Sequence, residues 1–396
     1  RLLALSAVLA TALHESSASD IPDDGIAKRQ AFNFPAQLWP KANFGFDANV
    51  PEQTKQATRI AAKFWNDNTC LDVVEAPEAT PRIVVQDAGS ACFSGGIGYY
   101  PWEPVRKMQL PTSGRCGWFR FAAHELAHVF GFYHIHVRHD RDQYITMVPE
   151  NWKRSIDEAA TTRHNNNFGL PYDYGSIMQY SATLLSKDGT SPTWLAKNPM
   201  YQQTMGSHIV SFYDVSMMNE LYGCKKRCAS ATTQCANGGF PHPRDCSKCL
   251  CPSGFAGDTC TERPAGCGAS LTATSTPQTF NWTMVHGDNE EMLFDFCHWH
   301  ITAPEGGRIE AKIVDLHLPY RPYWAQQDYK EDPFCIGGCT RQGIEIKYLA
   351  DTAYTGARFC CKEQVNTTLT SSSNVMPIIA FARQYSLGFA IQYRLV

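Results

Sequence analysis

Residues 124–134 read HELAHVFGFYH, and this stretch decides what the chain can be. His124 and His128 are four positions apart, so on a helix both imidazoles project from one face, one turn apart. Two neutral imidazoles at that separation can bind a single zinc ion. Gly131 ends the helix, because glycine tolerates the left-handed conformation found at helix C-termini. The chain can then turn back, so that His134 becomes the third nitrogen ligand.

The carboxylate beside the first histidine is the predicted acid and base of the site. We expect Glu125 to reach a water at the metal rather than the metal itself. Three histidines leave one coordination position open for that water, which is the mark of a catalytic zinc. A structural zinc, the alternative, would normally need a closed shell of four ligands, often with cysteine. The stretch therefore predicts hydrolysis, in which Glu125 takes a proton from the attacking water and delivers it to the leaving group.

Further side chains near this stretch bear on the assignment. His136 and His139 could compete for the role of third ligand, but His134 has the right offset from Gly131, and we expect the other two nearer the surface. Downstream, residues 176–180 read SIMQY, and a methionine turn beneath a three-histidine zinc is the metzincin arrangement. Met178 is then expected to form a polarisable apolar floor under the ligands.

The composition is that of a globular protein. The chain has 396 residues, 43% of them hydrophobic and 18% charged, which predicts two or three domains with real cores. The net charge of -3 provides no basic field, so neither nucleic acid nor an anionic membrane is an expected partner. No run approaches the roughly 18 apolar residues of a membrane span, which favours a soluble protein.

The cysteines and the first 30 residues predict secretion. Sixteen cysteines persist as disulfides only in an oxidising compartment. Residues 1–19 have the basic start and short apolar stretch of a signal peptide, and because no Met begins it, we expect a truncated start. Residues 20–30 are interpreted as a short pro-segment with a dibasic processing site at Lys28-Arg29. N-glycosylation sequons begin at Asn281 and Asn366, in agreement with an extracellular location.

Changes in composition divide the rest of the chain into three parts. Residues 31–224 form one folded unit, with a helix expected over 52–66, a strand over 82–86 and a helix over 119–130. Residues 225–261 hold six cysteines and too few apolar residues for a core, so disulfides must fold them. Residues 267–396 contain runs of alternating hydrophobicity at 292–296, 308–313, 344–348 and 378–381, which predict an antiparallel sandwich. The fold class is therefore α+β, and the metzincin arrangement described above implies an active-site helix and a mixed sheet in the first part.

The motif around the three histidines and the stretches downstream of it resemble one known family. HELAHVFGFYHIHVRHDRD (residues 124–142), with PYDY and SIMQY downstream, closely resembles the astacin family of metalloendopeptidases over residues 31–224. The resemblance implies one zinc ion per chain and the hydrolysis of peptide bonds in extracellular proteins. It also implies that Tyr180 is an additional zinc ligand, which can swing away and stabilise the oxyanion. Some family members, especially in nematodes, continue into EGF-like and CUB domains, and residues 225–261 and 267–396 are similar to these.

The resemblance further implies disulfide pairs. Those expected are Cys70–Cys224, Cys92–Cys116, Cys228–Cys246, Cys235–Cys249, Cys251–Cys260 and Cys267–Cys297. Cys335, Cys339, Cys360 and Cys361 should make two further bridges, whose pairing the sequence leaves open.

Two departures from the family concern activation. The family usually has Glu directly after the third histidine, where it anchors the new N-terminus, but this chain has Ile135. Residues 14–29 also lack the Phe-x-Gly-Asp pattern that caps the zinc in many family pro-segments. An alternative is thus a catalytically silent adhesion or binding protein that makes protein contacts through its CUB and EGF-like modules. Substrate preference stays open, because residues 181–185 contain no cation to select acidic residues.

Overall fold

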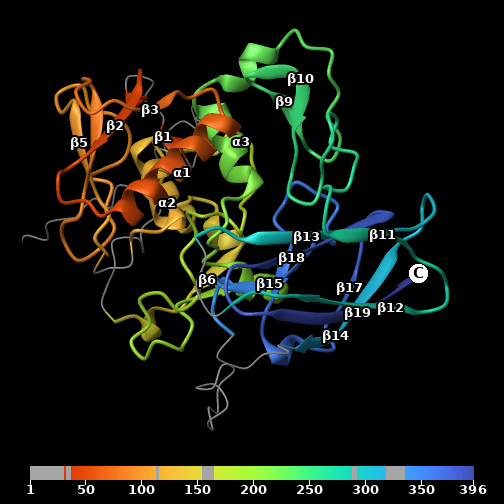
Figure 1. The fold of residues 1–396 in the computed structure, drawn as a ribbon. Helices are drawn as coiled ribbons and strands as arrows, with labels where there is room; N and C mark the ends of the chain where they lie inside the picture. Colours follow the sequence, from red (N-terminus) through yellow and green to blue (C-terminus); the bar gives the residue numbers. More distant parts are fainter. Residues whose placement is uncertain (1–30, 33–36, 113–115, 154–164, 288–291, 318–334) are drawn as a thin grey trace, which may run out of the picture.

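The structure, a computed structural model, describes residues 31–32, 37–112, 116–153, 165–287, 292–317 and 335–396 (Figure 1). The expected signal peptide and pro-segment lie outside these residues. Three units follow one another along the chain: an N-terminal unit with a sheet and three α-helices, a small hairpin unit and a C-terminal sandwich (Figure 1). Across the described residues, no helix has both the length and the apolar character that crossing a membrane requires.

The N-terminal unit is built on a four-stranded sheet in the order β3-β2-β4-β5. Its strands are β2 (Ala42–Phe46), β3 (Val73–Glu75), β4 (Arg82–Gln86) and β5 (Val105–Gln109), and all neighbouring pairs are parallel. An antiparallel bridge from Phe93 to Gln109 makes the sheet mixed at its β5 edge. Strand β4 coincides with the range expected from its β-branched residues.

Two helices share the core of this sheet. Helix α1 (Glu52–Asn68) buries Ala57, Ala61 and Trp65 completely, and it runs two residues beyond the predicted end. Helix α2 (Phe119–Val129) packs against α1 and is buried along most of its length. Gly131 follows with a φ of 118°, and its N–H donates to the His128 carbonyl. The predicted glycine stop is therefore confirmed, because this left-handed region suits glycine.

Shorter elements complete the N-terminal unit. Strand β1 (Ala31–Phe32) pairs with β7 (Asn165–Asn166), β6 (Ile145–Met147) pairs with β8 (Trp194–Ala196), and helix α3 (Phe212–Leu221) ends the unit. Within the described ranges, the 3-10 turns are η3 (Ile135–Val137), η4 (Arg141–Gln143), η5 (Pro149–Asn151), η7 (Pro199–Thr204), η8 (Cys224–Cys228) and η10 (Lys362–Gln364).

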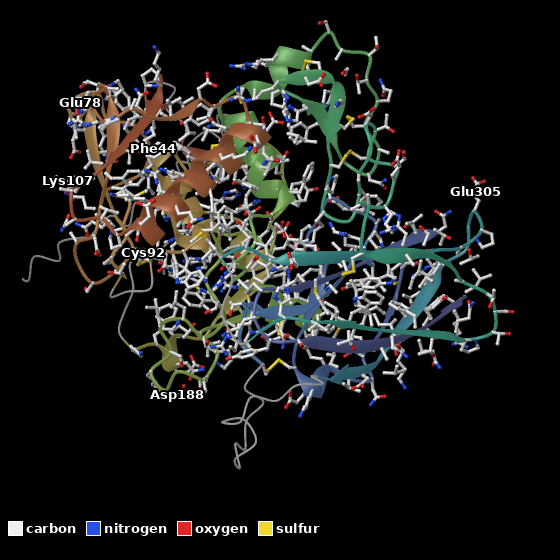
Figure 2. All side chains as sticks on the ribbon, in the orientation of Figure 1. Phe44, Glu78, Cys92, Lys107, Asp188 and Glu305 are labelled. Atoms are coloured by element: carbon white, nitrogen blue, oxygen red, sulfur yellow. A yellow bond between two sulfur atoms is a disulfide. The ribbon has the colours of Figure 1, made fainter. Side chains whose placement is uncertain are left out.

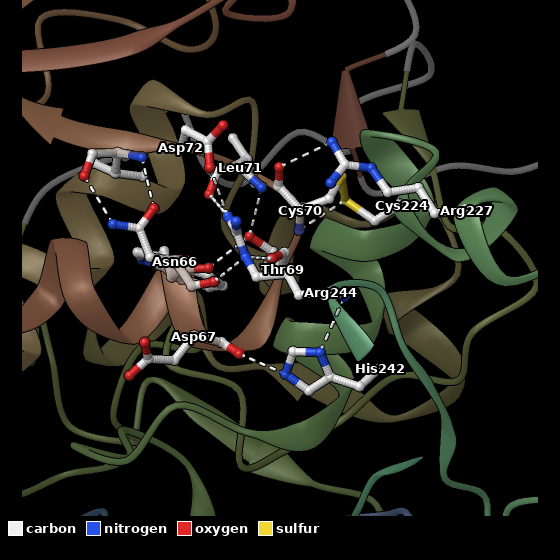
Figure 3. A network of polar contacts seen from close by, with 12 residues as sticks. Asn66, Asp67, Thr69, Cys70, Leu71, Asp72, Cys224, Arg227, His242 and Arg244 are labelled. Carbon is white, nitrogen blue, oxygen red and sulfur yellow. Dashed lines mark hydrogen bonds and ion pairs between the residues drawn. A yellow bond between two sulfur atoms is a disulfide. The ribbon is translucent and has the colours of Figure 1, made fainter. Parts of the chain in front are cut away.

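The small unit is a hairpin of β9 (Phe240–His242) and β10 (Asp245–Leu250), held on the end of α1 by polar contacts (Figure 3). Arg244 Nε donates to the carbonyls of Asn66 and Thr69, both at 2.8 Å, and its Nη2 pairs with Asp72 at 2.9 Å. His242 Nε2 donates to the Asp67 carbonyl at 2.8 Å. A helix C-terminus exposes unpaired carbonyls and a partial negative charge, so an arginine is a favourable partner there.

The C-terminal unit is a sandwich of two sheets (Figure 1). One has the order β11-β13-β18-β15-β16 and the other β12-β19-β14-β17. The strands are β11 (Gly268–Thr272), β12 (Gln278–Met284), β13 (Asp295–Thr302), β14 (Ile309–His317), β15 (Gln342–Ile346), β16 (Ala357–Phe359), β17 (Thr368–Thr370), β18 (Val375–Ala382) and β19 (Leu387–Leu395). The strand expected over 292–296 begins only at Asp295, and Phe294 directly before it packs on Phe381. Pairing is antiparallel except for β11 with β13, which is parallel.

Eight disulfides join all sixteen cysteines (Figure 2). Six of them are the pairs that the family resemblance implied. The open pairing is Cys335–Cys361 and Cys339–Cys360. These last two bridges tie the segment before β15 to the end of β16.

The sandwich is docked on the N-terminal unit through buried polar contacts. Thr355 Oγ1 donates to Asp173 Oδ2 at 2.9 Å, and the Tyr354 hydroxyl donates to the Tyr172 carbonyl. Arg358 Nη1 donates to Ser207 Oγ at 2.7 Å, and its own ion pair with Glu345 is buried on both sides. Such groups are costly to bury unless they are partnered, so these contacts fix one orientation of the two units.

Candidate metal centre

The three predicted histidines converge at the start of the turn that follows α2. His128 Nε2 lies 3.1 Å from His134 Nε2, which lies 3.3 Å from His124 Nε2. Two nitrogens bound at 2.0–2.1 Å to one tetrahedral centre would be about 3.3 Å apart, so this spacing fits zinc. His136 and His139 are not members of the cluster of potential ligand atoms.

Backbone carbonyls fix the tautomers of two of these rings. His124 Nδ1 lies 2.8 Å from the Ile177 carbonyl, and His128 Nδ1 lies 2.6 Å from the Phe132 carbonyl. Because a carbonyl can only accept, both Nδ1 atoms carry the hydrogen, and the Nε2 lone pairs face the common point. This is the usual support for a histidine that ligates a metal.

The site keeps these rings neutral. Burial lowers the pKa of His128 to about 4 and those of His124 and His134 well below the ordinary value of 6.5, and the neighbouring His128 lowers the latter two further. A neutral imidazole is the form that binds zinc, so no proton has to be displaced near neutral pH.

Glu125 lies on α2 beside the first ligand and is 5% exposed. Burial raises the pKa of its carboxyl to about 8, while the positive charge of Arg120 acts in the opposite direction. A carboxyl in this range can both accept and hold a proton near neutral pH, as general acid–base catalysis requires.

The methionine turn, which contains the SIMQY stretch, is hydrogen-bonded to the chain at two of the predicted ligands. Met178 is fully buried in the same core as α2, and its carbonyl accepts from the Ile135 N–H. The Ile177 carbonyl holds His124, as described above. The turn therefore orients one ligand directly and the backbone after His134 indirectly.

Asp214 holds this turn, and it is a residue that the sequence reasoning missed. Its carboxylate accepts from Ser176 Oγ at 2.5 Å and from the Ile177 N–H at 2.9 Å, and it forms a capping box with Ser211 at the start of α3. The spacing of Ser211 and Asp214 is that of a capping box, so the helix start was detectable from the sequence. The role of Asp214 in holding the methionine turn could not be predicted, because Asp214 and Ile177 are 37 residues apart in the chain.

Tyr180 lies against the third ligand. Its ring centroid is 4.4 Å from that of His134 and 4.2 Å from that of His136. The expectation that His136 is near the surface is wrong: it is fully buried, between Tyr180 and Trp194, with burial lowering its pKa to about 3. It lies in η3, which folds back behind the ligands and is covered by Trp194, 58 residues further along the chain. His139 is half-buried.

Ile135 occupies the position where the resemblance leads one to expect Glu. It is 1% exposed and belongs to the hydrophobic core that continues into the sandwich. Ala31, at the start of the described chain, is also fully buried and bridges to Phe132. The position directly after the third ligand is thus apolar, where the family usually has a carboxylate.

A cleft opens over the three histidines and Glu125, with a volume of about 990 Å³. Phe93, at the edge of the sheet, and Tyr180 line it, and so do Ile336, Gly337 and Thr340 of the sandwich. Arg120, one turn before His124 on α2, also lines the cleft. It is a cation outside residues 181–185, where the sequence shows none.

A helix with two histidines, a glycine turn that returns a third and a methionine turn beneath them place the N-terminal unit in the metzincin class of metalloproteases. The family model Astacin (Peptidase family M12A) matches residues 31–223. The chain is 38% identical over 401 residues to zinc metalloproteinase nas-31 of Caenorhabditis elegans, an alignment covering 98% of this chain and 61% of that protein. It is 33% identical to nas-27 of the same organism, covering 89% of this chain and 83% of the relative. The chain belongs to the astacin family of metalloendopeptidases.

The chain spans less than two thirds of the length of nas-31. Among solved structures, it is similar to high choriolytic enzyme 1, a hatching enzyme zinc-protease from the medaka fish Oryzias latipes. That match has 23% sequence identity and a TM-score of 0.45, and it covers 49% of this chain and 98% of the other.

Proposed function

We propose that this chain is a secreted zinc-dependent endopeptidase that cuts peptide bonds within extracellular proteins. The observation that carries the proposal is the convergence of three Nε2 atoms, on His124, His128 and His134, beside a buried carboxyl whose pKa is raised. Zinc bound there supplies a Lewis acid and lowers the pKa of a water molecule towards about 7.

The residues around the metal then have separate roles. Glu125 takes the proton of the attacking water on its carboxylate and delivers it to the departing amine nitrogen. Tyr180, an additional zinc ligand in the resting site by family resemblance, donates its hydroxyl hydrogen to the oxyanion. Met178 and Asp214 keep the ligand rings in place by packing and by hydrogen bonds to the turn.

The shape of the cleft favours a peptide chain as substrate. A volume of about 990 Å³ is more than one side chain needs, and the cleft extends from the sheet edge at Cys92 and Phe93 to Ser207 and His208. The edge segment at Phe93 can pair with an extended peptide through its backbone. Because the cleft extends past the metal site on both sides, an extended segment of the substrate can bind across it, which favours cleavage within the substrate chain rather than at its ends.

The other assignments support an extracellular setting. Eight disulfides require an oxidising compartment. Asn281 and Asn366 are both exposed, so their sequons are open to glycosylation. We assign residues 225–261 to an EGF-like module and 267–396 to a CUB module, with processing after Arg29 to release the enzyme.

The test is the Glu125→Gln variant of the processed, zinc-loaded chain on casein. It should retain one zinc ion per chain, because Glu125 is not a ligand, and lose cleavage by a factor of at least about 1,000. Treatment of the wild-type protein with a chelator should abolish cleavage, and added zinc should restore it. Full activity in the variant would refute Glu125 as the acid and base of the site, whereas a wild-type protein that binds zinc without cutting any peptide would favour the silent binding protein.

A further inference from the structure

The methionine turn is held from two sides. Asp214 of α3 bonds it on one side, as described above, and the loop between β15 and β16 of the sandwich contacts the chain just before it on the other. Tyr354 and Thr355 of this loop are both buried. A Cβ added to Gly175, directly before the SIMQY stretch, would lie 2.3 Å from Thr355 Cγ2. The loop and the turn therefore touch, with no room for a side chain between them.

One chain of hydrogen bonds runs from the loop to the catalytic tyrosine proposed above. The Tyr354 hydroxyl donates to the Tyr172 carbonyl, and the Tyr172 hydroxyl donates to Gln179 Oε1. Gln179 Nε2 then donates to the Tyr180 carbonyl at 3.0 Å. Tyr172 and Gln179 are buried. The backbone position of Tyr180 is thus linked to a hydroxyl that the sandwich supplies.

A second chain runs from the loop to the first metal ligand. Thr355 Oγ1 donates to Asp173 Oδ2 at 2.9 Å, and Asp173 Oδ1 accepts from the Gly175 N–H at 3.0 Å. Two residues further along the same turn, the Ile177 carbonyl accepts from His124 Nδ1 at 2.8 Å. The orientation of the His124 ring is therefore linked to Thr355 through the backbone of the turn.

The burial of these groups gives the two chains their effect. A polar network in a low-dielectric interior holds one arrangement, because a donor or acceptor that loses its partner there has no water to replace it. Hydrogen bonds behind a metal ligand orient its ring, and their loss lowers metal affinity or activity. Tyr354 and Thr355 are not among the residues that line the cleft, so they act on the turn and not on the substrate.

We propose that Tyr354 and Thr355 are positioning residues for catalysis: they hold the methionine turn so that His124 and Tyr180 keep their orientation at the metal. The sandwich is then part of the catalytic unit and not only a module that binds partners. The inference deepens the proposed endopeptidase function and rests on it.

The test uses point variants of the processed, zinc-loaded full-length chain. Thr355→Val keeps the shape of the side chain and removes its donor, Thr355→Ser keeps the hydroxyl, and Tyr354→Phe removes only a hydroxyl. Thr355→Val and Tyr354→Phe should each lower kcat about three- to tenfold, the loss of one buried hydrogen bond, while KM stays within about twofold. Thr355→Ser should recover most of the kcat lost in Thr355→Val.

Tyr348→Phe is the matched control. Asn198 Nδ2 donates to the Tyr348 hydroxyl at 2.9 Å across the same interface between the sandwich and the N-terminal unit, but this bond belongs to neither chain. The substitution should leave kcat within about twofold of wild type. All variants are assayed well below their midpoints of thermal unfolding, so that a loss of folded protein is not read as a loss of kcat.

A second measurement reports the metal site without turnover. Cobalt(II) bound in place of zinc has a visible absorption spectrum that depends on the geometry of its ligands. Thr355→Val should change this spectrum, because the His124 ring loses part of its support. Thr355→Ser and Tyr348→Phe should keep the wild-type spectrum.

Two results would overturn the positioning role. One is an unchanged kcat and cobalt spectrum in Thr355→Val and Tyr354→Phe, with only a lower midpoint of thermal unfolding, since the contacts would then serve docking alone. The other is an equal loss of kcat in Tyr348→Phe, since any loosening of the interface would then have the same effect. A wild-type chain that cuts no peptide refutes the endopeptidase function instead, and the cobalt spectra then decide the positioning role alone.

Discussion

Gly338 of the sandwich and Gly206 of the N-terminal unit touch backbone to backbone, at a position where a Cβ on Gly338 would lie 2.3 Å from the Gly206 oxygen. Gly338 also has a φ of 82°, and Gly206 itself packs against Ser181, next to Tyr180. This contact ties the docking of the sandwich to the geometry of the metal site.

The first prediction concerns this contact. Gly338→Ala should lower the midpoint of thermal unfolding by several degrees and should reduce kcat/KM, because the new Cβ must push residues 335–341 of the sandwich away from Gly206. Gly306→Ala is the matched control: its φ of 77° is similar, but a Cβ there meets nothing within 4 Å. It should cost only about 1 kcal/mol in stability from the left-handed conformation and leave activity intact. Equal effects of the two substitutions would contradict the proposed coupling.

The second prediction concerns pH and the buried interface carboxyl of Asp173. Burial raises the pKa of Asp173 from 3.8 to about 6, and the negative charge of Asp214 adds to this. The folded state therefore holds this proton more tightly than the unfolded state does. The resulting stability is fully present below pH 3.8 and is lost as the pH rises through about 6.

Asp173→Asn should remove this dependence, because its amide is neutral at every pH. It can still accept from the Gly175 N–H and donate to Thr355 Oγ1. Relative to wild type, the variant should gain up to about 3 kcal/mol between pH 4 and pH 8. Urea unfolding at both pH values measures the gain. A difference between the two proteins that does not change with pH would contradict the assignment.

The third prediction concerns proton competition at the metal. With the pKa of His128 near 4 and those of His124 and His134 also well below 6.5, zinc retention should change little between about pH 5.5 and about pH 7.5. Equilibrium dialysis against a zinc buffer measures it. A surface cluster of histidines would lose zinc across this range, so a steep loss centred near pH 6.5 would show that the rings are not buried as described.

The sequence could predict the local part of the site. The spacing of His124, His128 and Gly131 determines a helix, its shared face and its end, all within one element and the turn that follows. Helix α1 and strand β4 were found for the same reason, since their burial patterns are periodic. These features depend on neighbours in the chain.

The parts that the sequence did not predict are non-local. Trp194 covers His136 and Asp214 hydrogen-bonds the methionine turn, and in both cases the two partners are tens of residues apart in the chain. The docking of the sandwich depends on the Gly338–Gly206 contact, which no periodic pattern encodes. The Cys335–Cys361 pairing could not be chosen either, because Cys360 and Cys361 are adjacent and both lie within reach of the same loop.

The last prediction concerns Tyr180, whose ring lies against His134 and His136. Tyr180→Phe keeps the ring and its packing and removes only the hydroxyl. If that hydroxyl donates to the oxyanion, kcat should fall about 100- to 1,000-fold, the loss found for a single oxyanion donor, while KM changes little. Zinc content should stay at one ion per chain, because three histidines remain.

Tyr144→Phe is the control for Tyr180→Phe, since Tyr144 stacks on Tyr172 and does not line the cleft. It should leave kcat within about twofold of wild type. A Tyr180→Phe enzyme with an unchanged kcat would mean that the oxyanion is stabilised without this hydroxyl. A rise in KM at constant kcat would instead place the hydroxyl in substrate binding, because such a change removes an interaction made equally in the ground state and the transition state.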